Sequence, residues 1–129
     1  MTKVPFSGAL QGFRILIVED ESILAMDLEN RLQREGCDVI GLASGEAKAL
    51  KLLEQDRPDA VVLDLNLNGK LATGLADALV ARQIPFVIVT GYGKRQFDAP
   101  ALQEAPRLHK PVKTEELVRA LSDLVRAAN

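Results

Sequence analysis

Four places in this chain combine a short apolar run with a polar residue at its end. Two of the runs are followed by carboxylates, one by a hydroxyl group and one by an ammonium group. In chain order these polar residues are Glu19, Asp20, Glu21, Asp64, Thr90 and Lys110. Carboxylate oxygens suit a hard divalent cation such as Mg²⁺, and an ammonium group stabilises negative charge on a phosphoryl group in transfer. If the four run ends meet in space, they indicate metal-assisted phosphoryl transfer to a carboxylate.

The apolar runs predict the strands that would position these residues. Short, β-branched runs that are apolar on both faces are typical of a buried parallel sheet. The expected strands cover residues 14–18, 38–43, 60–63, 86–89 and 107–109. Amphipathic segments with apolar residues at helical spacing predict the helices between them. The expected helices cover residues 21–35, 45–56, 73–82 and 114–127.

Strands that alternate with helices predict βαβ units, and these give a parallel sheet covered on both faces. The expected fold class is therefore α/β, a doubly wound five-stranded sheet. Glycines and prolines crowd residues 91–106, so we expect a weak or missing fourth helix there. Ligands of open parallel sheets gather at the carboxyl ends of the strands. All the polar residues at the run ends should then face one edge.

Each of these residues also has a structural interpretation when it is taken alone. An acid that closes a strand is often a turn former or a helix cap, and a loop lysine is usually solvated. Two or three carboxylates within ~4 Å repel one another by several kcal/mol at an effective dielectric constant of about 20. A cation removes that repulsion, and hard oxygen ligands favour Mg²⁺. The combination at one edge therefore favours a magnesium site.

The length, net charge and composition of the chain further limit its possible functions. A chain of 129 residues fits one domain, and we divide it into a flexible lead-in over 1–12 and the domain over 13–129. The net charge of −2 gives no electrostatic case for a nucleic-acid partner. Cys37 is the only cysteine and is interpreted as part of a buried strand start. The chain lacks a signal-peptide pattern and a membrane-length apolar run, so we expect a cytoplasmic protein without a membrane partner.

Four segments together resemble the receiver domain of two-component response regulators. They are Val18-Glu19-Asp20-Glu21, Leu63-Asp64-Leu65-Asn66, Val89-Thr90-Gly91 and Lys110-Pro111. The resemblance covers about residues 13–127, and the step from Asp20 to Asp64 is typical of the family. It implies a flavodoxin-like sheet with strand order 2-1-3-4-5 and a stand-alone, single-domain receiver.

The resemblance also implies a role for each matching residue. Asp64 would be the phosphoacceptor and, with Asp20, would supply the side-chain ligands of Mg²⁺. Glu19 would hold the metal through water, and the main-chain carbonyl of Asn66 would complete the coordination. The phosphoryl-sensing residues would be Thr90 and Lys110. A sensor histidine kinase or a histidine phosphotransfer protein would be the phosphodonor.

One position departs from the family pattern. The family carries an aromatic residue three positions before the lysine-proline pair, which moves with the threonine. Here that position is Arg107, and placing a charged group in a buried apolar slot is costly. Tyr92 follows Thr90 by two residues. The switch candidates are therefore Tyr92 and Arg107, with a surface turn residue as the alternative interpretation of Tyr92.

The expected function is signalling by protein–protein contacts after phosphorylation of Asp64. The downstream protein is unknown. We expect no enzyme activity beyond self-catalysed phosphotransfer and dephosphorylation. A phosphate sink is the first alternative. A phosphatase with an aspartate nucleophile is a weaker one, because such enzymes place Asp-x-Asp after their first strand. Here the nearest match is Asp64-Leu65-Asn66, which follows the third strand and lacks the second acid. The complete set of site residues argues against a receiver that works without phosphorylation.

Overall fold

Strands and helices alternate along the chain as the sequence predicts. The computed structural model describes residues 8–91, 102 and 105–128. Its main strands are β1 (Arg14–Val18), β2 (Asp38–Ala43), β3 (Ala60–Asp64), β6 (Phe86–Thr90) and β7 (Arg107–His109). Its helices are α1 (Ser22–Arg34), α2 (Glu46–Gln55), α3 (Thr73–Ala81) and α5 (Thr114–Ala128). Two of the strands run further than predicted, so that Asp64 and Thr90 are the last residues of β3 and β6.

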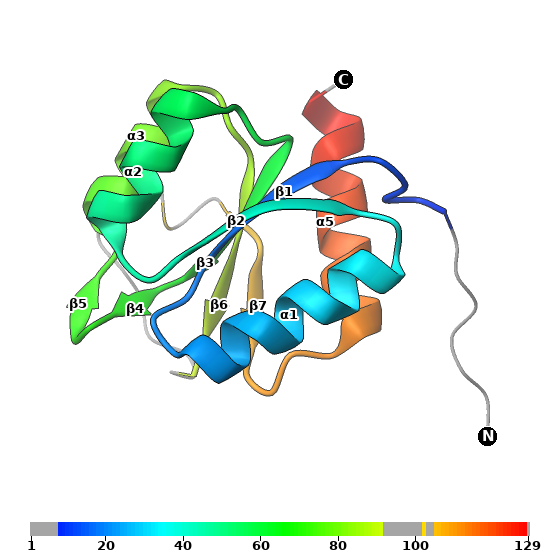
Figure 1. Cartoon of the computed structure of the whole chain (residues 1–129), viewed down its shortest axis with the longest axis horizontal. Coiled ribbons are helices and arrows are strands. Elements are labelled where there is room, and N and C mark those ends of the chain that lie inside the picture. The colour runs from blue at the N-terminus through cyan, green and yellow to red at the C-terminus, as the bar shows by residue number, and fades with distance from the viewer. Residues whose placement is uncertain (1–7, 92–101, 103–104, 129) are drawn as a thin grey trace.

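The five main strands form one parallel sheet in the order β2-β1-β3-β6-β7 (Figure 1). This order confirms the predicted flavodoxin-like, doubly wound α/β fold. The register brings the strand ends level: Val18 pairs with Leu63, Asp64 with Val89, and Thr90 with His109. The residues at these ends therefore share one edge of the sheet.

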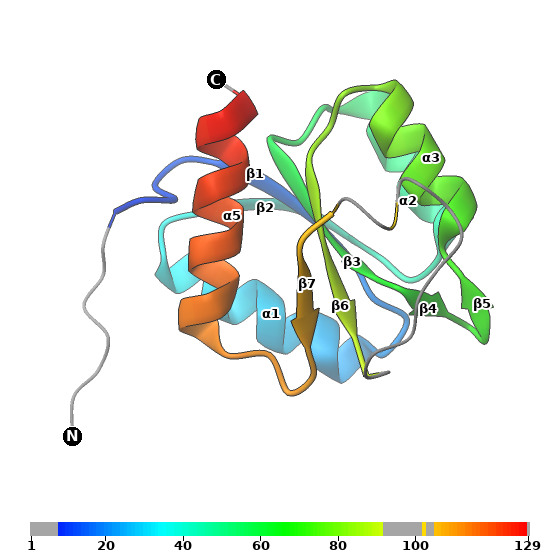
Figure 2. The ribbon, with the colours of Figure 1, turned by 180° about the vertical axis from the view of Figure 1, so that it is seen from behind.

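Helices cover both faces of the sheet, which explains why its central strands are apolar on both sides. Helices α2 and α3 lie on one face, and α1 and α5 lie on the other (Figures 1 and 2). Each face has its own cluster of buried side chains, and Leu102 belongs to the cluster beneath α2 and α3. None of the helices in the described part of the chain has the length and apolarity needed to cross a bilayer. The predicted weakness of a fourth helix concerns residues 91–106, of which only 91, 102, 105 and 106 are among those described.

The end of the predicted lead-in packs against the domain. Leu10 is 1% exposed and joins the core cluster beneath α1 and α5, together with Cys37. The amide of Gly12 donates to the carbonyl of Gly36 at 2.8 Å, just beyond the end of α1. Burying a leucine side chain is worth about 1.5–3 kcal/mol. One buried apolar side chain therefore joins residues 8–12, the end of the predicted lead-in, to the core.

A short hairpin follows β3 that the sequence analysis did not predict. It consists of β4 (Asn66–Leu67) and β5 (Lys70–Leu71), which pair antiparallel. Asn68 and Gly69 form the two-residue turn between them, with φ of +53° and +82°. Asn-Gly is the favoured sequence for such a turn, since both positions need φ > 0. The hairpin is too short to carry a periodic apolar pattern, so only the Asn-Gly pair could have revealed it.

Candidate functional site

The ends of the strands bring the predicted site residues together. Glu19 and Asp20 directly follow β1, and Asp64 is the last residue of β3. Thr90 ends β6 and is 2% exposed. Lys110 follows β7, and its amide donates to the Thr90 carbonyl at 2.9 Å. All of them lie at the carboxyl edge of the sheet, where the topology predicts them.

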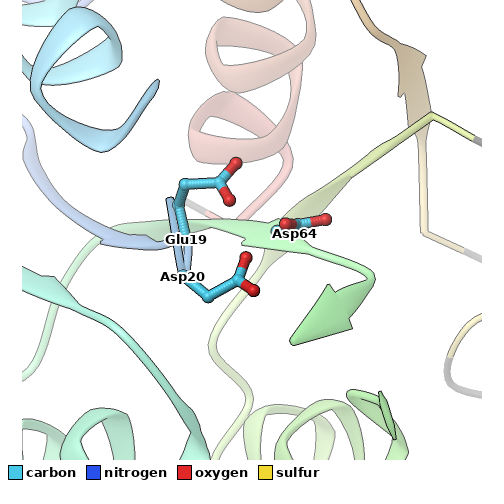
Figure 3. Close-up of side chains that lie close together, drawn as sticks. All are labelled: Glu19, Asp20 and Asp64. Carbon is cyan, nitrogen blue, oxygen red and sulfur yellow. The ribbon is translucent and has the colours of Figure 1, made fainter. Parts of the chain in front are cut away.

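Three carboxylates form a cluster at this edge. Glu19, Asp20 and Asp64 each offer one oxygen atom, and these atoms lie within 4.8 Å of one another. Figure 3 shows their side chains gathered at the ends of β1 and β3. Glu19 is 3% exposed and Asp64 is 5% exposed, whereas Asp20 is only half-buried. Carboxylates so close and so little hydrated destabilise one another unless positive charge lies beside them.

Lys110 supplies part of that positive charge. Its Nζ atom lies 3.2 Å from Oε1 of Glu19 and 3.5 Å from Oδ2 of Asp64. One ammonium group therefore faces two buried acids. With three carboxylates and one ammonium group, the site keeps an excess of negative charge that a divalent cation would neutralise.

The electrostatics of the site appear in the shifted pKa values of its members. Burial raises the pKa of Glu19 to about 7, and the neighbouring Asp64 carboxylate adds to this effect. Burial also acts to raise the pKa of Asp20, but the hydrogen bonds that its carboxylate accepts from the Asn68 amide and from the Glu19 carboxyl group outweigh burial and hold that pKa below its usual value. Burial opposes the charged form of Lys110, yet the carboxylates of Asp64 and Glu19 raise its pKa above the ordinary value. The site therefore favours bound protons or cations at Glu19 and charge on Asp20 and Lys110.

A main-chain amide holds each of the three carboxylates. The pairs are Glu21 N–H to Glu19 Oε2 (3.2 Å), Asn66 N–H to Asp64 Oδ1 (3.2 Å) and Asn68 N–H to Asp20 Oδ2 (3.1 Å). Such bonds to charged acceptors fix the orientation of the carboxylate. The donor set, entirely oxygen and already oriented, fits a hard cation such as Mg²⁺.

Of the two predicted switch residues, only Arg107 is among the described residues, and it is not a member of this carboxylate cluster. Tyr92 is not among the described residues. Arg107 lies in β7, and its Nη2 atom donates to the carbonyl of Leu102 at 2.9 Å. His109, one residue before Lys110, is exposed. Asn68 is the contributor that sequence reasoning missed, and the Asn68-Gly69 pair was its only signal.

Comparison with known proteins agrees with this geometry. The family model described as "Response regulator receiver domain" matches residues 15–122. The transcriptional regulatory protein PdtaR of Mycobacterium tuberculosis (strain CDC 1551 / Oshkosh) is 31% identical over 114 residues, which cover 84% of this chain and 54% of PdtaR. The phyllosphere-induced regulator PhyR of Methylorubrum extorquens is 30% identical over 111 residues, which cover 84% of this chain and 42% of PhyR. The chain thus spans about half the length of these curated relatives, or less.

A solved structure of similar length extends the comparison. The solution structure of SdrG from Sphingomonas melonis Fr1 superposes with a TM-score of 0.75 at 39% identity, covering 91% of this chain and 98% of SdrG. The crystal structure of a sensor protein from Polaromonas sp. JS666 superposes with a TM-score of 0.78 at 27% identity, covering 90% of this chain and 98% of the sensor protein chain. Sequence, fold and the arrangement of the strand ends therefore agree, and the chain belongs to the response regulator receiver domain family.

Proposed function

We propose that this receiver domain accepts a phosphoryl group on Asp64 in a Mg²⁺-dependent reaction and signals through protein–protein contacts. The observation that carries the proposal is the surroundings of the Asp64 carboxylate. The Lys110 ammonium group lies 3.5 Å from it, and oxygens of Glu19 and Asp20 lie within 4.8 Å. A nucleophilic carboxylate, a fixed cation and a cation-binding acid pair are the parts that phosphoryl transfer to an aspartate needs.

The chain's own residues would act as follows. An oxygen of Asp64 attacks the phosphorus of a phosphohistidine, so that the P–N bond breaks as the P–O bond forms and the imidazole leaves with its electron pair. Lys110 stabilises the negative charge on the phosphoryl oxygens. Thr90, at the end of the neighbouring strand, hydrogen-bonds the phosphoryl group after transfer. A Mg²⁺ ion held by Asp20 and Asp64, with Glu19 acting through water, would supply the remaining positive charge.

The main-chain carbonyl of Asn66 is the fourth proposed metal ligand, and the hairpin supports this role. In an antiparallel ladder, bonded and non-bonded pairs alternate. Ala72 N–H donates to the Leu65 carbonyl at 2.9 Å, so the next pair, Asn66 with Leu71, is the non-bonded one. The main-chain groups of Asn66 then face away from β5. On that side its N–H already meets Asp64.

A histidine kinase or a histidine phosphotransfer protein is the proposed phosphodonor. The cytoplasm is the proposed compartment, because it supplies the ATP that such kinases use. The downstream partner is a protein rather than nucleic acid. Tyr92 and Arg107 remain the proposed switch residues; the Arg107 bond to the Leu102 carbonyl couples β7 to the segment before it. A phosphate sink is the alternative if no partner responds to phosphorylation.

The experiment is intact-mass analysis after incubation with acetyl phosphate and Mg²⁺. The wild type should gain the mass of one phosphoryl group, and Asp64→Asn should gain none. Asp77→Asn, which changes an exposed aspartate of α3, is the matched control and should be modified like the wild type. A gain that survives in Asp64→Asn, or no gain and no beryllofluoride binding in the wild type, rules out the proposal. Repeated turnover of phosphate monoesters would instead favour an aspartate-nucleophile phosphatase.

A further inference from the structure

The tip of the β4–β5 hairpin has an uncommon backbone conformation. Asn68 and Gly69 both have positive φ, +53° and +82°, in the turn that joins the paired residues Leu67 and Lys70. Few side chains adopt this left-handed region at low cost, and asparagine is one of them. A β-branched residue at position 68 would be a severe outlier there.

This conformation brings the hairpin tip to the acid cluster. The Asn68 N–H donates to Oδ2 of Asp20 at 3.1 Å. The Asn68 side-chain amide reaches the carbonyl of Ser44, after β2, at 3.5 Å, which is a long and weak contact. The main-chain contact, rather than the side-chain contact, is therefore the one that orients the Asp20 carboxylate.

The base of the hairpin is anchored firmly enough to make the tip a fixed point. Leu65 and Leu67 are 0% and 4% exposed and belong to the core beneath α2 and α3. Ala72 N–H closes the base by donating to the Leu65 carbonyl at 2.9 Å. The same hairpin carries the Asn66 N–H that holds Asp64. One anchored hairpin thus positions two of the three carboxylates.

We propose that Asn68 is a positioning residue of the metal site, because its left-handed backbone aims the main-chain N–H at Asp20 and sets that carboxylate for the cation. This inference rests on the proposed function, since it assumes that the acid cluster binds Mg²⁺. It assigns the role to the backbone conformation at position 68, so a glycine there should serve almost as well as asparagine. A residue that rejects positive φ should not.

The test is the Mg²⁺ affinity of purified variants by isothermal titration calorimetry, at a temperature where all are folded. Asn68→Gly keeps the N–H and the freedom to adopt positive φ, so its dissociation constant should lie within about twofold of the wild-type value. Asn68→Val forces the turn to rearrange, and its dissociation constant should rise by about fivefold or more. The amide resonance of residue 68 should shift on Mg²⁺ addition in the wild type and in Asn68→Gly.

Gly12→Val is the matched control. Gly12 has φ of +80° in a turn outside the site, and no atom lies near its missing Cβ. The control should unfold more easily in EDTA but bind Mg²⁺ like the wild type. Wild-type affinity in Asn68→Val, equal weakening in Asn68→Gly and Asn68→Val, or an equal loss in Gly12→Val would each overturn the inference alone. A wild type that binds no Mg²⁺ and takes no phosphoryl group would overturn the proposed function and this inference with it.

Discussion

Replacing Glu19 by glutamine should stabilise the metal-free protein at alkaline pH. The Glu19 side chain is 3% exposed, and its pKa is raised from 4.5 to about 7, chiefly by burial and then by Asp64. Ionisation of this group is therefore harder in the folded chain than in the unfolded one. Each unit of difference corresponds to about 1.36 kcal/mol, so the ionised carboxylate costs the fold up to ~3 kcal/mol above pH 7. Glutamine keeps the shape without the charge.

The sign follows from proton binding. Between pH 4.5 and about 7 the folded protein holds a proton on Glu19 that the unfolded chain has released. The wild-type free energy of unfolding should therefore fall as pH rises through this window and level off above it. Glu19→Gln also loses the ion pair with Lys110. The value of about 7 for the pKa of Glu19 already includes the lowering effect of that ion pair. We expect a net gain of about 1–3 kcal/mol at pH 8 and almost none near pH 4.5.

Urea denaturation in EDTA, followed by circular dichroism, measures this difference. Glu54→Gln, which changes an exposed glutamate of α2, is the control and should stay within about 0.5 kcal/mol of the wild type at both pH values. Saturating Mg²⁺ should shrink or reverse the advantage of Glu19→Gln, because the cation stabilises the ionised carboxylate. A variant that is less stable than the wild type at pH 8 in EDTA, or whose gain is unchanged by Mg²⁺, would refute the reasoning.

Two further predictions concern Lys110 and Leu10. Lys110→Met leaves Glu19 and Asp64 without the ammonium group that faces both, so the free energy of unfolding in EDTA at pH 8 should fall by about 1–3 kcal/mol. Added Mg²⁺ should restore part of this loss. Urea titrations with and without Mg²⁺ measure both effects, and unchanged stability would contradict the prediction. Leu10→Ala removes a side chain that is 1% exposed and should lower the free energy of unfolding by about 2–5 kcal/mol. Its phosphorylation by acetyl phosphate, measured by intact mass at a temperature where the variant is folded, should match that of the wild type, and a stability loss below 1 kcal/mol would mean that residues 8–12 are not anchored.

Local pattern alone predicted most of the fold. A strand buried on both faces must be apolar throughout, so the runs 14–18, 60–63 and 86–89 could be recognised without their neighbours. The hairpin could not be recognised in that way, because two-residue strands carry no periodicity. The burial of Leu10 was also hidden, since the glycines and proline around it are typical of a flexible segment and only the core contacts hold it in place.

The sequence by itself determined that the predicted site residues meet, because parallel strands end at one edge and so bring Glu19, Asp20, Asp64, Thr90 and Lys110 to the same place. Their physical state was decided only by the tertiary structure. The raised pKa of Glu19 and the bridging position of Lys110 depend on burial and on distances between side chains more than forty positions apart in the chain. Asn68 contacts the carboxylate cluster because a left-handed turn places its amide 3.1 Å from Oδ2 of Asp20. Distances and desolvation of this kind belong to the packed molecule, and a linear pattern does not contain them.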